Sequence, residues 1–136
     1  MSNEINLLEE GSELNLQFEK RGGVLPVIVQ ESTSGEVLMI AYINQEALSH
    51  SIQYKEAAFW STSRNELWIK GMTTGNRMSL DEILVDCDQD AVLYKVTLTA
   101  GGVCHTKKND GSYRKSCFYR RLKLDNHTLT FNKEDE

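Results

Sequence analysis

The chain has 136 residues, which is within the usual range for one domain and enough to bury one hydrophobic core. Its 20 acidic and 15 basic side chains give a formal net charge of -5, which argues against a general nucleic-acid-binding surface. No apolar run approaches the roughly 18 residues that a membrane helix needs, and the acidic start MSNEINLLEEGSELNLQFEK is unlike a secretion signal. We therefore expect one cytoplasmic domain over residues 1–136, with residues 1–20 as an N-terminal extension, residues 132–136 as a frayed tail, and neither a membrane nor a nucleic-acid partner.

The first half of the chain predicts two hairpins separated by a helix. The β-branched, apolar runs VLPVIVQ and EVLMIAYI lie on either side of Ser34-Gly35 and predict the first hairpin. Asn44 is a typical helix N-cap, and the apolar spacing after it predicts an amphipathic helix from about Gln45 to Lys55. The segments AAFWSTS and ELWIKG predict a second hairpin around Arg64-Asn65, and TTGN after them predicts a loop.

The second half predicts strands only. RMSLDEILVDC and AVLYKVTLTA predict two strands, and SCFYRRLKL and HTLTF predict a final pair around Asp125-Asn126. The total is six to eight strands and one or two helices, without the alternation of strand and helix that a parallel sheet requires. The sequence therefore predicts a small, strand-rich, single domain of the α+β class.

The segment LVDCDQDAV places Asp86, Asp88 and Asp90 at every second position, with Cys87 between the first two. In an extended segment the three carboxylates would share one face and Cys87 would point to the other. Carboxylate oxygens suit Mg²⁺, whereas a thiolate suits zinc. The alternative is a solvated acidic turn.

Three cysteines, Cys87, Cys104 and Cys117, form no CxxC pair, so they are either small buried side chains or metal ligands. Cys104 and Cys117 bracket a polar, glycine-containing loop and could meet at its base. With Cys87, from the same or a second subunit, they would form a three-thiolate zinc site with an open fourth position. His105 is a candidate acid/base group beside such a site, because histidine readily takes and returns a proton near neutral pH; a surface histidine is the alternative.

Seven segments together resemble the phosphoribosyl-AMP cyclohydrolase family, in order between about Leu25 and Arg120. They are LPVIVQ, GEVLMIAYINQEAL, FWSTSRNELWIKG, TTGN, DCDQD, CHT and SCFYR. The resemblance implies a zinc-dependent hydrolase of histidine biosynthesis, which opens the adenine ring of phosphoribosyl-AMP between N1 and C6 to give the formamidine imidazole carboxamide ribotide. It also implies an intertwined homodimer, with zinc bound by cysteines from both subunits and Mg²⁺ bound by aspartates.

Carried over by residue, the resemblance assigns zinc to Cys87, Cys104 and Cys117, magnesium to Asp86, Asp88 and Asp90, and the acid/base role to His105. The implied purine nucleotide carries two phosphates, which need cations and loop amides. Our candidates for binding it are Ser63, Arg64, Lys70, Thr73, Thr74, Gly75 and Arg120. We expect Trp60 and Trp68 to pack in the core, and the loop cations Lys107, Lys108, Arg114 and Lys115 to be solvated.

Four features differ from the family pattern. Met72 is at a position that is usually Glu in the family, Asn76 at one that is often His, Arg77-Met78 is atypical, and the spacer from Cys104 to Cys117 is longer. They leave two alternatives: a diverged paralogue that acts on another purine nucleotide, or a non-catalytic dimer with structural zinc, in which the long loop fills the fourth coordination position.

Overall fold

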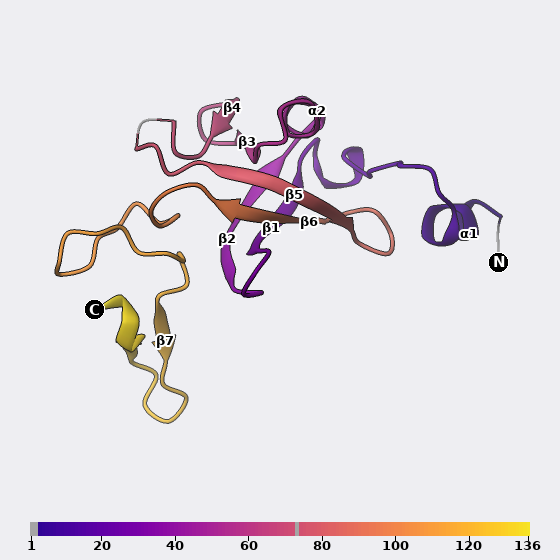
Figure 1. The fold of residues 1–136 in the computed structure, drawn as a ribbon. Helices are drawn as coiled ribbons and strands as arrows, with labels where there is room; N and C mark the ends of the chain where they lie inside the picture. The colour runs from indigo at the N-terminus through magenta and orange to yellow at the C-terminus, as the bar shows by residue number, and fades with distance from the viewer. Residues whose placement is uncertain (1–2, 73) are drawn as a thin grey trace.

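A four-stranded sheet forms the centre of the computed structural model, which describes residues 3–72 and 74–136 (Figure 1). The strand order is β2-β1-β6-β5. The strands are β1 (Leu25–Glu31), β2 (Val37–Ile43), β5 (Met78–Val85) and β6 (Val92–Leu98). β1 pairs antiparallel with β2 and parallel with β6, and β5 pairs antiparallel with β6. The first predicted hairpin and the two longer strands are therefore confirmed.

One face of this sheet is covered by α2 (Gln45–Tyr54) and by the hairpin of β3 (Ala58–Ser61) and β4 (Glu66–Ile69), which lie together in Figure 1. Asn44 caps α2 as predicted, because its side chain accepts a hydrogen bond of 2.9 Å from the backbone N–H of Ala47. Asn65 has a φ of +54°, a left-handed conformation that suits the turn between β3 and β4.

The core lies between the sheet and this cover. Alternate β1 residues Leu25, Val27 and Val29 are fully buried, as are Tyr94 on β6 and Phe59 on β3. The period of two in β1 thus places one set of side chains in the core, and this set packs against the aromatic residues of the cover and the neighbouring strand.

The other face of the sheet carries an apolar row that crosses all four strands. Ile40 is opposite Ile28, Ile28 is opposite Leu93, and Leu93 is opposite Leu84. Residues opposite each other in a sheet point to the same face. Ile40, Ile28 and Leu84 are 57%, 40% and 44% exposed, so this row lies largely on the surface.

The chain ends lie beyond opposite ends of the sheet in Figure 1. At the N-terminus are α1 (Asn3–Glu10) and a 3₁₀ turn, η1 (Glu19–Arg21). At the C-terminus are β7 (Arg120–Leu122) and β8 (Leu129–Phe131), which pair antiparallel, and a 3₁₀ turn, η2 (Lys133–Asp135).

The last residues are packed, contrary to the expectation that residues 132–136 fray. Asp135 is buried, and its carbonyl oxygen accepts a hydrogen bond of 2.8 Å from Nε of Arg114. The backbone N–H of Asn109 donates to the carbonyl of Glu136 at 3.1 Å. A loop far away in the sequence therefore holds this end.

Within the described residues the fold has eight strands and two α-helices in one small domain, as predicted for the α+β class. No helix in the described part of the chain is long and apolar enough to cross a membrane.

Candidate functional site

Two of the three cysteines lie close together beyond the end of β6. The backbone N–H of Cys104 donates to the carbonyl of Arg114 at 3.0 Å, which closes the long loop on itself. The backbone N–H of Cys117 donates to the carbonyl of Leu38 at 2.8 Å, which fixes the end of this loop to β2. The two thiols are near enough to affect each other's ionisation, so the structure brings them near one another at the base of the loop.

The environment of this thiol pair eases ionisation of one thiol and opposes ionisation of the other. Burial opposes ionisation of Cys104, but hydrogen bonds from Thr106 and the charge of Lys70 lower the pKa of its thiol. Desolvation and the charge of Cys104 raise the pKa of the Cys117 thiol to about 11. A bound cation would remove the penalty on the second ionisation, so the donor set fits a thiophilic metal.

Cys87 lies too far away to join this pair within one chain. It precedes β6, whereas Cys104 follows it. The seven residues of β6 alone span on the order of 20 Å. In a single chain, therefore, the three predicted zinc ligands do not form one site.

The acidic segment is a turn and not an extended strand. Residues 86–90, which we call the acidic turn, connect β5 to β6, and Gln89 has a left-handed φ of +57°. Ligand atoms of Asp86, Cys87 and Asp88 lie within 4.8 Å of one another, so the prediction that Cys87 points away from the aspartates is wrong. Within the described part of the chain, the buried Oδ1 of Asp88 has no hydrogen-bond partner, which fits a cation site.

Asp90 differs from the other two aspartates because it is buried and paired with cations. Its Oδ2 lies 2.8 Å from the guanidinium of Arg21 and 3.2 Å from Nζ of Lys20. Hydrogen bonds with Asp88, Asp86 and Arg21 lower the pKa of Asp90, whereas the contacts with Asp90 and Asp88 raise that of Asp86. Such crowding of carboxylates is relieved by a bound cation.

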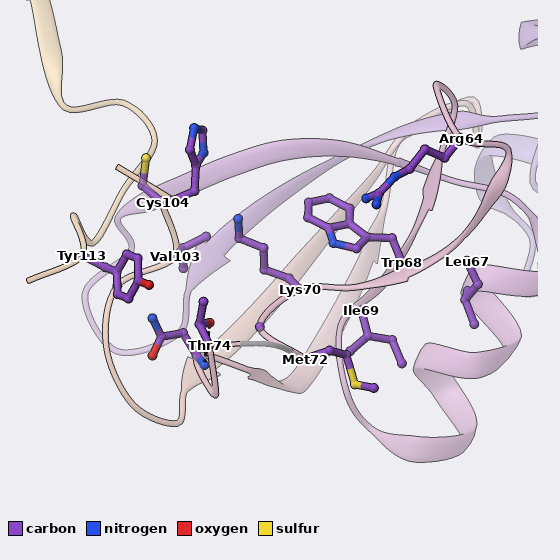
Figure 2. A pocket seen from close by; sticks show the side chains of 14 residues that line it. Arg64, Leu67, Trp68, Ile69, Lys70, Met72, Thr74, Val103, Cys104 and Tyr113 are labelled. Atoms are coloured by element: carbon purple, nitrogen blue, oxygen red, sulfur yellow. Dashed lines mark hydrogen bonds between the residues drawn. The ribbon is translucent and has the colours of Figure 1, made fainter. Parts of the chain in front are cut away.

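Two cavities, of about 360 Å³ and about 470 Å³, meet beside the thiol pair. Both are lined by Arg64, Trp68, Lys70 and His105. Cys104 lines the smaller cavity and Cys117 the larger one. Figure 2 shows Lys70 projecting into the space between Trp68 and Cys104. The site therefore combines thiols, a histidine and two cations around an aromatic wall.

The other predicted substrate-binding residues are distributed unevenly around these cavities. Thr74 lines the smaller cavity and Ser63 the larger one. Gly75 is next to Thr74 and has a φ of +82°, and Thr73 lies outside the described residues. Arg120 lines neither cavity; its guanidinium lies 5.6 Å from the ring of Tyr119.

Several side chains have roles that sequence reasoning missed. Trp68 packs against the core, as expected, but it also lines both cavities, with Nζ of Lys70 5.3 Å from its ring. Tyr113 lines the smaller cavity from the long loop, where no sequence signal marks it. Arg114 is buried, so the expectation that it is solvated is wrong. The side chain of Lys115 is 42% exposed and lies 2.7 Å from Glu31.

Two of the positions that differ from the family pattern lie in the smaller cavity. Met72 is exposed in its wall, and Asn76 accepts a hydrogen bond of 3.0 Å from the backbone N–H of Gly101. Arg77 lies outside the cavity and forms a two-pronged ion pair with Glu56, at 2.5 and 2.6 Å. The differences thus affect the cavity wall in two cases and a structural contact in the third.

Comparison with known proteins places this arrangement in a family. The family model described as phosphoribosyl-AMP cyclohydrolase matches residues 39–119. Proteins named phosphoribosyl-AMP cyclohydrolase from Hyphomonas neptunium and Streptococcus mutans are 47% and 46% identical to this chain, over 84% and 82% of its length and 81% and 95% of theirs. One from Desulfatibacillum aliphaticivorans is 43% identical over 85% of this chain and 88% of its own. The chain therefore belongs to the phosphoribosyl-AMP cyclohydrolase family.

Proposed function

We propose that the chain is a zinc-dependent hydrolase that opens the adenine ring of phosphoribosyl-AMP between N1 and C6, a step of histidine biosynthesis. The observation that carries the proposal is the meeting of the two cavities at His105, Arg64 and Lys70, beside the thiols of Cys104 and Cys117. Family membership supports the substrate, and the cavity lining supports the chemistry.

Hydrolysis adds the oxygen of water to C6 and a proton to N1 as the bond between them breaks. His105 lies on the wall shared by both cavities, where it could take the proton from water and return it to N1. Zinc bound by the thiolates would lower the pKa of a bound water to about 7 and so supply a nucleophile at neutral pH. Arg64 and Lys70 would hold the phosphates, with Ser63, Thr74 and Gly75 as further contacts.

The test is turnover of phosphoribosyl-AMP, followed by absorbance, on protein assayed for zinc and treated with or without a tight chelator. We expect turnover that the chelator abolishes. His105→Ala should keep its zinc and lose turnover, whereas Cys104→Ala should lose both. Full zinc content in Cys104→Ala would refute the ligand assignment, and undiminished turnover in His105→Ala would refute the acid/base role.

We further propose that the active protein is a homodimer in which Cys87 of one copy completes the zinc site of the other. Its distance from the thiol pair of its own chain supports a second copy as its partner. The exposed apolar row of Ile40, Ile28 and Leu84 offers a surface that a second copy could cover.

A mixing experiment separates a shared site from a site within one chain. Cys87→Ala and Cys104→Ala are each expected to be inactive alone. If sites are shared, a mixed dimer has one intact site, so random exchange should restore about a quarter of wild-type activity. A mixture with no more activity than the separate variants would refute the shared site.

A second candidate function is hydrolysis of another purine nucleotide. It is favoured by Met72 and Asn76, which line the smaller cavity at positions where the family pattern differs. This candidate predicts a zinc-loaded protein that fails to turn over phosphoribosyl-AMP, and normal turnover would eliminate it. In either case Mg²⁺ would lie at the acidic turn, where Asp86 and Asp88 have oxygens within reach of one ion.

A further inference from the structure

The N-terminal extension is fastened to the acidic turn by the side chain of Gln89. Its amide Nε2 donates to the carbonyls of Leu8 and Glu13 at 3.0 and 3.2 Å, and its Oε1 accepts from the backbone N–H of Asn15 at 2.7 Å. The carbonyl of Gln89 accepts from the backbone N–H of Gln17 at 2.8 Å. Residues 8–17, which we call the strap, are thus tied to a single residue of the turn.

The backbone conformation at Gln89 favours glycine, whereas the hydrogen bonds to the strap require an amide side chain. Gln89 is 6% exposed and has a left-handed φ of +57°, a backbone conformation that is unfavourable for most residues other than glycine. Glycine would adopt this backbone without strain but could make none of the three side-chain hydrogen bonds. A carboxylate could accept from Asn15 but could not donate to the two carbonyls. The amide is therefore needed for the strap and not for the shape of the turn.

The strap also forms one wall of a cavity that reaches Asp86, one of the candidate cation ligands. This cavity, of about 300 Å³, has Glu9 and Glu13 of the strap on one side and Asp86 and Cys87 of the turn on the other. Three residues after the strap, Lys20 lies 3.5 Å from Oδ2 of Asp88. In Figure 1, α1 is next to the loop between β5 and β6.

We propose that Gln89 is a positioning residue, through which docking of the strap and binding of a divalent cation at the acidic turn are coupled. The inference rests on the proposed function, in which the turn binds Mg²⁺. The ligand atoms of Asp86 and Asp88 lie within 4.8 Å of each other, so their carboxylates repel. A turn held in place before the ion arrives loses less freedom when the ion binds. Coupling of this kind is reciprocal, so the ion must also tighten the strap.

The variant Gln89→Gly tests this coupling, because it removes the three side-chain bonds and keeps the backbone conformation. Its carbonyl can still accept from the N–H of Gln17, so amide hydrogen exchange at Gln17 measures release of the strap and not loss of the acceptor. The matched control is His127→Gly, which also changes a left-handed residue, φ +60°, to glycine, but in the exposed C-terminal hairpin.

We expect exchange at Gln17 to be at least about tenfold faster in Gln89→Gly without metal, since each lost bond contributes a factor of several. Mn²⁺ alone, titrated as a probe by its paramagnetic signal, should bind Gln89→Gly about tenfold more weakly than the wild type. Added Mn²⁺ or Mg²⁺ should slow exchange at Gln17 in the wild type. His127→Gly should match the wild type in all three measurements.

Three results would overturn the proposal in distinguishable ways. Unchanged exchange at Gln17 in Gln89→Gly would mean that Gln89 does not fasten the strap. Faster exchange in Gln89→Gly with an unchanged Mn²⁺ affinity would mean that Gln89 holds the strap in place, but that docking of the strap is not coupled to binding of the ion. No binding of Mn²⁺ or Mg²⁺ to the wild type would refute both the coupling and the proposed magnesium site, while the zinc-dependent activity would still be tested separately by its chelator sensitivity.

Discussion

Ser51 is the polar centre of the core that supports the cavity wall, and Ser51→Ala should destabilise the fold strongly. Ser51 is fully buried on α2, where its Oγ donates to the carbonyl of Ala47 at 2.9 Å. It accepts from the backbone N–H of Ala58 at 3.0 Å and from the hydroxyl of Tyr94 at 3.2 Å. One hydroxyl therefore connects the helix, the hairpin that carries Trp68, and the central sheet.

The expected loss follows from the groups that Ser51→Ala leaves unpaired. The buried N–H of Ala58 would lose its acceptor, which costs about 1–3 kcal/mol of stability. The hydroxyl of Tyr94 would also lose its acceptor, which costs about 1 kcal/mol more. The free energy of unfolding should thus fall by about 2–4 kcal/mol, which lowers Tm by roughly 6–15 °C for a chain of this length.

Urea and thermal unfolding of four variants test this assignment. Tyr94→Phe should cost only about 1 kcal/mol, because Ser51 keeps its other partners, and the double variant should cost about 1 kcal/mol less than the sum of the two. The control Ser49→Ala, on the exposed side of α2, should stay within about 0.5 kcal/mol of the wild type. A loss below 0.5 kcal/mol for Ser51→Ala, or strict additivity, would refute the reasoning.

Three further predictions concern pH and the long loop. Burial raises the pKa of Tyr94 to about 12. The contribution of the neutral Tyr94 to the free energy of unfolding should therefore be fully present below about pH 10 and be lost between about pH 10 and 12. Alkaline unfolding of Tyr94→Phe should not show this dependence on pH. The hydrogen bond from Lys115 lowers the pKa of Glu31 below its ordinary 4.5, so the free energy of unfolding should fall as the pH drops through that lowered value. In Glu31→Gln the free energy of unfolding should depend less steeply on pH in this acid range. An unchanged dependence would contradict the pairing of Glu31 with Lys115. Arg114→Met should cost about 2 kcal/mol in urea, because Arg114 is 8% exposed and its guanidinium lies 4.4 and 4.9 Å from the rings of Tyr119 and Phe131. Arg114→Lys should recover part of the loss, and no loss in either variant would show that the C-terminal hairpin does not depend on Arg114.

The elements that the sequence predicted correctly are those whose signals are local. The first hairpin, the helix after Asn44 and the second hairpin each follow from periodicity and from turn or cap residues within about a dozen positions. The two thiols of the long loop were also expected to meet, because both ends of a closed loop lie at its base.

The errors come from contacts that local patterns do not encode. The alternation of Asp86, Cys87 and Asp88 predicted opposite faces, but the antiparallel pairing of β5 with β6 requires a turn there, and in a turn neighbouring side chains can converge. The C-terminal residues were expected to fray because chain ends often do, but the carbonyl of Asp135 accepts a hydrogen bond from Arg114, 21 positions earlier. Likewise, nothing in the composition of the N-terminal extension indicates that Gln89 fastens it.

The position of β6 is the reason for proposing that the metal centre is shared between two copies of the chain. β6 is an inner strand of the sheet, and the acidic turn with Cys87 precedes it, whereas Cys104 follows it. A rigid paired strand cannot bend to bring its two ends together, so the separation of these ligands is set by the sheet itself. A second copy related by twofold symmetry could bring its own Cys87 to the thiol pair without distortion of either sheet. On this reasoning, a substitution that adds a charge to the apolar row, such as Ile40→Lys, should separate the copies and lose zinc and turnover together, while the isolated chain keeps its fold. Sedimentation, metal content and turnover would measure this, and a monomer that retains full zinc and turnover would refute it.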